Sequence, residues 1–124
     1  MPLPRKLHIA AFAFALSLWT WALLDPNPVP EPIRSELDID WQFILSKFLH
    51  GGGYAFLTVL GGTLVKRGRW AFIAGMALHG AATEVLQATM ELGRHGCIRD
   101  VLIDWAGILA GTLFLYLWPA RQNA

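Results

Sequence analysis

The sequence predicts an all-α membrane protein, folded as a four-transmembrane-helix bundle with both termini in the cytoplasm. Of its 124 residues, 55% are hydrophobic and only 15% are charged, whereas about a quarter of the residues of a soluble domain are charged. Four apolar stretches each approach the ~20 residues that a helix needs to cross the hydrocarbon core of a bilayer. Residues 1–124 therefore form a single membrane domain.

The expected helices cover roughly residues 7–24, 45–65, 70–90 and 100–118. The first follows Arg5 and Lys6, as the apolar part of a signal peptide would. Its apolar run, however, exceeds the ~7–15 residues usual in a signal peptide, and no small-x-small cleavage site precedes Asp25. We therefore predict a retained membrane anchor.

The first two helices are separated by an outer loop over residues 25–44. Its opening part is rich in proline, which forbids a continuous helix and favours extended backbone. Residues 33–42 fit either a short interfacial helix or an ordinary polar loop.

Basic residues predict the orientation of the bundle. They precede the first helix, fill the turn between the second and third helices, and follow the fourth: Arg5, Lys6, Lys66, Arg67, Arg69 and Arg121. Because segments rich in Lys and Arg stay in the cytoplasm, both termini are expected there and the loop 25–44 is expected outside.

Several classes of function are excluded by composition. A net charge of +1 provides no field that would attract nucleic acid. Cys97 is the single cysteine, so there is neither an intrachain disulfide nor the spacing of a cysteine zinc site. The sequence predicts no cofactor and no metal, and it leaves the oligomeric state open.

Polar residues recur at helical spacing on one face of each of the last three predicted helices. The faces carry Lys47, His50, Gly51 and Tyr54, then Gly80, Glu84, Gln87 and Glu91, then Asp100, Asp104, Gly107 and Gly111. A charged side chain at bilayer depth costs about 2.5–3.5 kcal/mol, so such residues normally face the bundle interior and pair there. We expect one shared polar cavity near the outer face, capped by Arg94 and Arg99.

Simpler interpretations exist for some of these residues. Lys47, Arg94 and Asp100 lie near helix ends, where charged side chains are often solvated. His79 lies deep in an apolar helix and is expected to be a hydrogen-bonded packing residue. The motif Gly107-x-x-x-Gly111 indicates close helix contact.

From Ser46 onward, the sequence resembles the VanZ-like family of small bacterial membrane proteins, named for an accessory protein in glycopeptide (teicoplanin) resistance. The matching positions are Lys47, His50, Tyr54, Glu84, Gln87, Arg94, Asp100, Gly107 and Gly111. Two positions depart from the family pattern: Ser46 replaces an acidic residue, and Asp104 replaces an asparagine.

The resemblance implies a multi-pass protein of the bacterial cytoplasmic membrane, associated with the cell envelope and with antibiotic resistance. We expect it to bind or modify a lipid-linked or cell-wall-derived molecule at the outer leaflet. The candidate catalytic residues are His50 as base, Glu84 as acid and Asp100, which would orient His50. The candidate binding residues are Lys47, Tyr54, Gln87, Arg94 and Asp104.

Alternatives remain at this point, and the sequence does not decide whether the protein is an enzyme. A metal-assisted version would use His50, Glu84 and Asp100 as ligands, although their spacing is not diagnostic of a metal site. A non-enzymatic structural or regulatory protein would use the same polar residues only to specify helix packing. Proton transport is a third hypothesis, but the chain lacks the inverted repeat typical of transporters.

Overall fold

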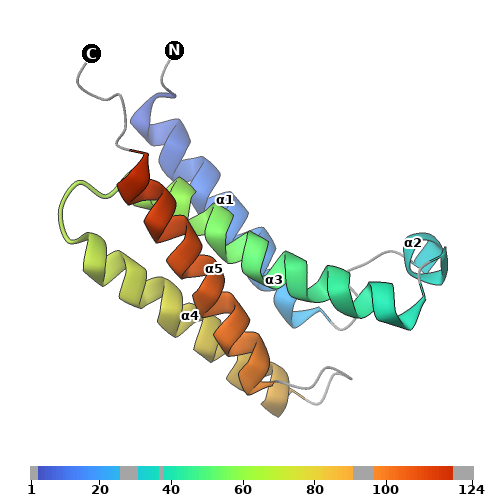
Figure 1. The fold of residues 1–124 in the computed structure, drawn as a ribbon. Helices are drawn as coiled ribbons and strands as arrows, with labels where there is room; N and C mark the ends of the chain where they lie inside the picture. Colours follow the sequence, from blue (N-terminus) through green and yellow to red (C-terminus); the bar gives the residue numbers. More distant parts are fainter. Residues whose placement is uncertain (1–2, 26–30, 37, 91–96, 119–124) are drawn as a thin grey trace.

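The structure is a computed structural model that describes residues 3–25, 31–36, 38–90 and 97–118. Its helices are α1 (Arg5–Leu24), α2 (Glu31–Glu36), α3 (Ile39–Gly62), α4 (Arg69–Thr89) and α5 (Ile98–Leu117) (Figure 1). Every regular element in the described ranges is a helix, which confirms the all-α prediction.

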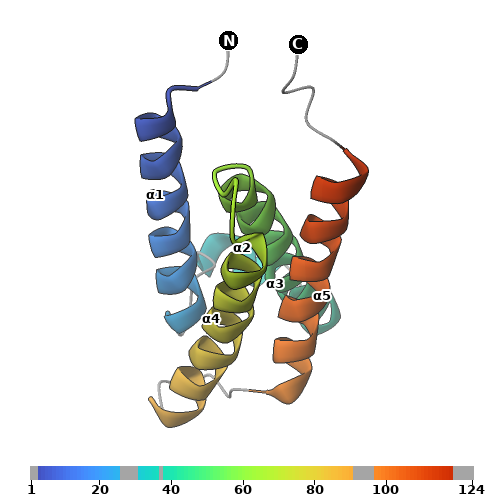
Figure 2. The ribbon, with the colours of Figure 1, turned by 90° about the vertical axis from the view of Figure 1, so that its left-hand side faces the viewer.

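The four long helices run alternately up and down, so α1 begins at the same end of the bundle at which α5 ends (Figure 1). In the side view, α1 and α5 flank α3 and α4 (Figure 2). The most extensive contact joins α3 and α5, which run in the same direction. Side chains from α3, α4 and α5 therefore meet inside the bundle.

Three helical segments are long and apolar enough to cross a membrane: Arg5–Leu24, Asp40–Gly62 and Ile98–Leu117. For these three, the prediction of helices long and apolar enough to cross a membrane is confirmed. Helix α4 has 21 residues, a sufficient length, but it is not among them. The reason is its composition, because His79, Glu84 and Gln87 lower its hydropathy.

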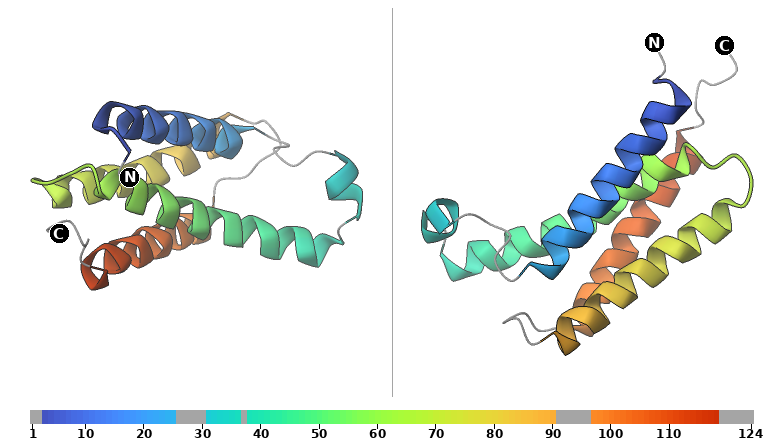
Figure 3. Two further views of the ribbon diagram at one scale, coloured as in Figure 1. Left: turned by 90° about the horizontal axis from the view of Figure 1, so that it is seen from above. Right: turned by 180° about the vertical axis from the view of Figure 1, so that it is seen from behind.

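The expected outer loop is shorter than predicted. Helix α3 begins at Ile39 rather than near residue 45, and α2 occupies residues 31–36. Asp38 caps α3, since its carboxylate accepts a hydrogen bond from the Trp41 backbone N–H at 2.8 Å. The first turns of α3 extend beyond the other helices and carry α2 with them (Figure 3).

Among the described residues, the buried polar and charged residues outnumber the buried apolar ones. The buried apolar residues are Leu23, Tyr54, Leu57, Met76 and Ile108, and the buried polar or charged residues are His50, Thr58, Thr83, Glu84, Gln87, Asp100, Asp104 and Thr112. Large apolar side chains such as Phe14, Phe48 and Leu117 are exposed. This inverts the pattern of a soluble protein and fits a bundle surrounded by lipid.

Candidate functional site

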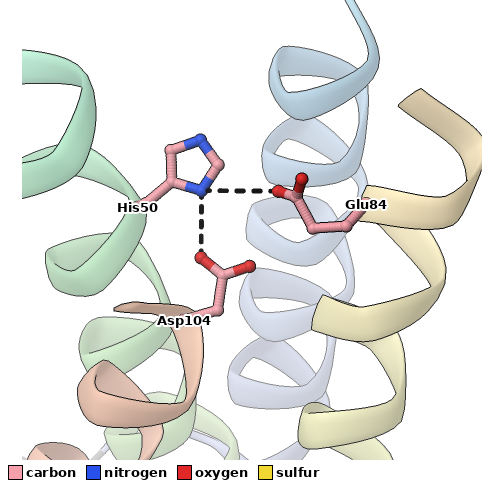
Figure 4. Close-up of side chains that lie close together, drawn as sticks. All are labelled: His50, Glu84 and Asp104. Carbon is pink, nitrogen blue, oxygen red and sulfur yellow. Dashed lines mark hydrogen bonds and ion pairs between the residues drawn. The ribbon is translucent and has the colours of Figure 1, made fainter. Parts of the chain in front are cut away.

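One residue from each of α3, α4 and α5 meets in the bundle interior: His50, Glu84 and Asp104 (Figure 4). His50 Nδ1 lies 3.0 Å from Asp104 Oδ1 and 3.9 Å from Glu84 Oε1. The exposed fractions of the three residues are 3%, 4% and 0%. We call this set the buried cluster, and it confirms that polar groups from three helices share one place.

The buried cluster lies near the end of the bundle at which α5 begins. Asp104 is about 9 Å along α5 from Ile98, and Glu84 is about 8 Å before the end of α4, at 1.5 Å of rise per residue. The basic turn between α3 and α4 is at the opposite end of the bundle (Figure 1). The cluster is thus separated from the basic segments by most of the length of the helices.

Glu84 also fixes the start of α5. Its Oε2 atom accepts a hydrogen bond of 3.0 Å from the backbone N–H of Cys97, the residue that precedes α5. A carboxylate at a helix N-terminus is favourable because backbone N–H groups there lack partners within the helix. One carboxylate therefore both anchors α5 on α4 and faces His50.

Two carboxylate oxygens of the buried cluster accept no hydrogen bond from the described residues. They are Glu84 Oε1 and Asp104 Oδ2, both fully enclosed. Because an ionised carboxylate only accepts hydrogen bonds, we assign the proton to His50 Nδ1 in its contact with Asp104 Oδ1. That single proton leaves the other two oxygens unsatisfied.

Asp100 does not orient His50, as the sequence led us to expect. The ammonium group of Lys47 donates a hydrogen bond to Asp100 Oδ1 and forms an ion pair with it. Asp104 is the carboxylate that contacts His50. The roles expected for the two aspartates are therefore corrected: Asp100 pairs with the lysine, and Asp104 orients the histidine.

The direction of the helices explains why Asp104, and not Asp100, contacts His50. Helices α3 and α5 run in parallel, so a step of one turn along α3 is matched by a step of one turn along α5. His50 lies three residues after Lys47, and Asp104 lies four residues after Asp100. The first pair is consequently Lys47 with Asp100 and the second is His50 with Asp104.

A glycine contact brings α3 and α5 close together. A Cβ atom on Gly107 would overlap the backbone of Gly51, and one on Gly111 would come within 2.7 Å of the Ala55 carbonyl oxygen. Small residues at such positions let two helix backbones approach. The predicted packing role of the Gly107-x-x-x-Gly111 motif is confirmed, and this contact sets the register of the buried cluster.

A second polar network lies beside the buried cluster and joins α1, α3 and α4. His79 Nε2 is 2.8 Å from Thr20 Oγ1, and His79 Nδ1 is 2.9 Å from the Tyr54 hydroxyl. Thr20 already donates to the Leu16 carbonyl oxygen. A neutral His79 that donates from Nε2 and accepts at Nδ1 satisfies all these contacts. The expectation that His79 is a hydrogen-bonded packing residue is confirmed.

The remaining candidate binding residues have different surroundings. Tyr54 is 0% exposed, and its hydroxyl is engaged with His79. Gln87 donates a hydrogen bond from Nε2 to the Leu23 carbonyl oxygen of α1. Arg99 is exposed. Arg94 and Glu91 lie outside the described residues.

A shallow groove runs along the outer surface between α3 and α5. Its volume is about 310 Å³, and it is lined by Lys47, Phe48, Gly51, Gly52, Ala55, Gly107 and Ala110. The surface of the groove is almost entirely apolar, and Lys47, whose ammonium group is bonded to Asp100, lies at one end of it. The groove is accessible from the side of the bundle, whereas the buried cluster is enclosed.

Sequence reasoning missed part of this arrangement. It did not anticipate Thr20 and Thr83, which contact His79 and Tyr54, or the groove beside Gly52 and Ala55. Helical spacing gives the face on which a residue lies but not the helix that this face meets. A signal for the groove was present, because Gly51, Gly52 and Ala55 put small residues on the same helix as Lys47.

Comparisons of this chain with protein-family models, with curated proteins and with solved structures find no match.

Proposed function

We propose that this chain is a VanZ-like integral membrane protein of the bacterial cytoplasmic membrane, with four membrane spans and both termini in the cytoplasm. The grouping of basic residues at one end of the bundle supports this orientation. Helix α4 crosses the membrane with the others because Glu84 and Gln87, the polar residues in its outer half, are buried against neighbouring helices instead of facing lipid.

The protein binds a lipid-linked or cell-envelope molecule at the outer leaflet. The observation that carries this proposal is the groove between α3 and α5, which has Lys47 at one end and apolar or small residues along the rest. The Lys47 ammonium group, which donates one of its three hydrogen bonds to Asp100, donates another to an anionic head group, and the hydrocarbon chain lies against Gly52, Ala55 and Ala110. A volume of about 310 Å³ is at the lower end of the usual range of ligand sites.

Binding is the version of this function that the groove supports directly. Modification of the bound molecule would use His50 as base and Glu84 as acid, which are buried in the bundle and do not line the groove. Arg94 stays a candidate for the head group. The resemblance to the VanZ-like family extends the proposal to glycopeptide (teicoplanin) resistance.

Native mass spectrometry of the protein purified from bacterial membranes tests the proposal. A Cβ atom at Gly52 would meet nothing within 4 Å, and Gly52 lines the groove, so we expect Gly52→Leu to fill the groove without disturbing the helix contacts. Gly75 on α4 is equally open, and Gly75→Leu is the matched control. We expect a bound lipid-linked molecule with the wild type and with Gly75→Leu, and its loss with Gly52→Leu.

The same variants test the link to resistance. Expression of the wild type in a teicoplanin-sensitive bacterium should raise the inhibitory concentration of teicoplanin, and Gly52→Leu should abolish that increase. Equal amounts of each variant in the membrane must be shown by immunoblot. A bound molecule that is retained by Gly52→Leu, with unchanged resistance, would contradict the assignment of the groove.

A structural or regulatory role is the second candidate, and the ties between helices favour it. Glu84 holds the start of α5, and Gln87 holds the end of α1. Glu84→Gln, measured beside the wild type, separates the two functions. Because Glu84 does not line the groove, a purely structural role predicts loss of folded protein in this variant and no bound molecule in the wild type, whereas a binding role predicts a bound molecule in the wild type.

A further inference from the structure

We propose that the buried cluster binds one divalent transition-metal cation through His50 Nδ1, one oxygen of Glu84 and one oxygen of Asp104. One ligand atom from each of these residues lies within 4.8 Å of the others. Ligand atoms bound to zinc at 2.0–2.2 Å in a tetrahedron lie roughly 3.4 Å from one another. The distances from His50 Nδ1, 3.0 Å to Asp104 Oδ1 and 3.9 Å to Glu84 Oε1, fall on either side of that value.

The unsatisfied oxygens are an independent observation that points to a cation. Glu84 Oε1 and Asp104 Oδ2 accept no hydrogen bond from the described residues. Their side chains are only 4% and 0% exposed, so bulk water does not reach them. A buried acceptor without a partner is destabilising. A cation between the three side chains removes that deficit.

Charge balance supports the same conclusion. In the metal-bound state, two carboxylates and a neutral imidazole carry two negative charges, which one divalent cation cancels. Lys47 is already paired with Asp100 and does not provide that compensation. Uncompensated charge at bilayer depth is unfavourable. The proton on His50 Nδ1 leaves when the metal binds, as for other histidine ligands.

The ligand set selects the class of metal. Calcium takes six to eight oxygen ligands, and magnesium requires octahedral oxygen coordination. One imidazole and two carboxylates suit zinc, and also cobalt or manganese. Three protein ligands leave a fourth position for water or substrate, as in catalytic zinc sites.

Asp104 distinguishes this metal site from the one that the sequence suggested, in which Asp100 was the third ligand beside His50 and Glu84. The parallel register of α3 and α5 places Asp104, and not Asp100, beside His50. Asp104 also stands where the resembled family usually has asparagine, a poorer metal ligand. The inference therefore rests on a residue of this chain and does not depend on the proposed ligand of the groove.

Cobalt titration of the full-length protein is the first test, in a Cys97→Ser background that removes the exposed thiol. Protein stripped with a chelator should bind one equivalent of Co²⁺ and show the visible absorption bands of four-coordinate cobalt. Zn²⁺ should displace the cobalt and raise the melting temperature. A folded protein without these bands, and with a melting temperature that Zn²⁺ does not change, would overturn the proposal.

Three variants locate the site. Asp104→Asn should weaken Co²⁺ binding at least about tenfold. Replacing a residue that only hydrogen-bonds to a metal ligand already lowers the metal affinity by about that factor. Asp100→Asn, one turn away, should retain the wild-type affinity. Asp104→Cys should retain binding and add a thiolate-to-cobalt charge-transfer band in the near ultraviolet. Equal affinity of Asp104→Asn and the wild type, or cobalt bound to Asp104→Cys without this band, would contradict the assignment.

Discussion

His50 on α3 and Asp104 on α5 are 54 positions apart in the chain, yet His50 Nδ1 lies 3.0 Å from Asp104 Oδ1 inside the bundle. Both residues are almost completely buried. Their contact exists because Gly107 lets α5 approach the backbone of α3 one turn further along. Helix packing and the polar site are therefore one structural feature, and substitutions can separate their contributions.

The first prediction concerns the shape and charge of Asp104. In Asp104→Asn, an amide oxygen still accepts the hydrogen bond from His50, so we expect a change in unfolding free energy within about 1 kcal/mol. Asp104→Leu leaves the His50 N–H without an acceptor, at a cost of about 1–3 kcal/mol, and its larger side chain adds an overpacking cost at this fully buried position. Reversible unfolding in mixed detergent micelles measures both. Equal stability of the two variants would show that the hydrogen bond contributes nothing.

The second prediction concerns the ion pair between Lys47 and Asp100. Removing one partner of a fully buried pair costs about 3–5 kcal/mol. The Lys47 side chain is 23% exposed, so we expect a smaller loss of about 1–3 kcal/mol for Asp100→Asn. The double variant Lys47→Met/Asp100→Asn should lose less than the sum of the single variants. A double-mutant cycle of unfolding free energies gives the coupling, and strict additivity would contradict the pair.

The sequence predicts the helices well because the length of an apolar stretch is a local property. The third predicted helix, 70–90, differs by one residue at each end from Arg69–Thr89. The start of α3 was predicted too late. The prediction relied on the beginning of a long apolar run, whereas the helix begins earlier, with residues 39–44, directly after the polar N-cap residue Asp38. Apolar length alone does not detect a cap of this kind.

The site was only partly predictable for a different reason. Helical spacing placed Lys47 and His50 on one face and both aspartates on another, but the choice of partner depends on the register between α3 and α5. That register is set by the contact of Gly107 with Gly51, which no local pattern specifies. The same holds for Thr20, whose contact with His79 joins helices far apart in the sequence.

The third prediction tests the glycine contact. Gly107→Ala would place a methyl group against the Gly51 backbone, which cannot move aside as a flexible side chain would. We expect a loss of about 1–3 kcal/mol of unfolding free energy, typical of overpacking. Gly75→Ala is the control, because a Cβ atom there meets nothing within 4 Å and should stabilise α4 by about 0.5–1 kcal/mol. Similar effects of the two substitutions would contradict the close contact.

The fourth prediction tests the network around His79. Tyr54→Phe keeps the buried ring but removes the hydroxyl that lies 2.9 Å from His79 Nδ1. The unpaired nitrogen should cost about 1–3 kcal/mol of unfolding free energy. Tyr116→Phe is the control, since Tyr116 is exposed and should change stability little. Unchanged stability of Tyr54→Phe would show that the hydrogen bond is not important for packing.

The last prediction tests the orientation of the bundle. Cys97 is exposed and lies immediately before α5, at the end of the bundle opposite the basic turn between α3 and α4. With four spans and both termini in the cytoplasm, a membrane-impermeant maleimide should label Cys97 in intact spheroplasts. Lys66 is exposed on that turn, so the variant Cys97→Ser/Lys66→Cys should be labelled only after lysis. The reverse pattern would invert the orientation, and labelling of both cysteines in intact spheroplasts would place both ends of α4 outside and exclude α4 as a membrane span.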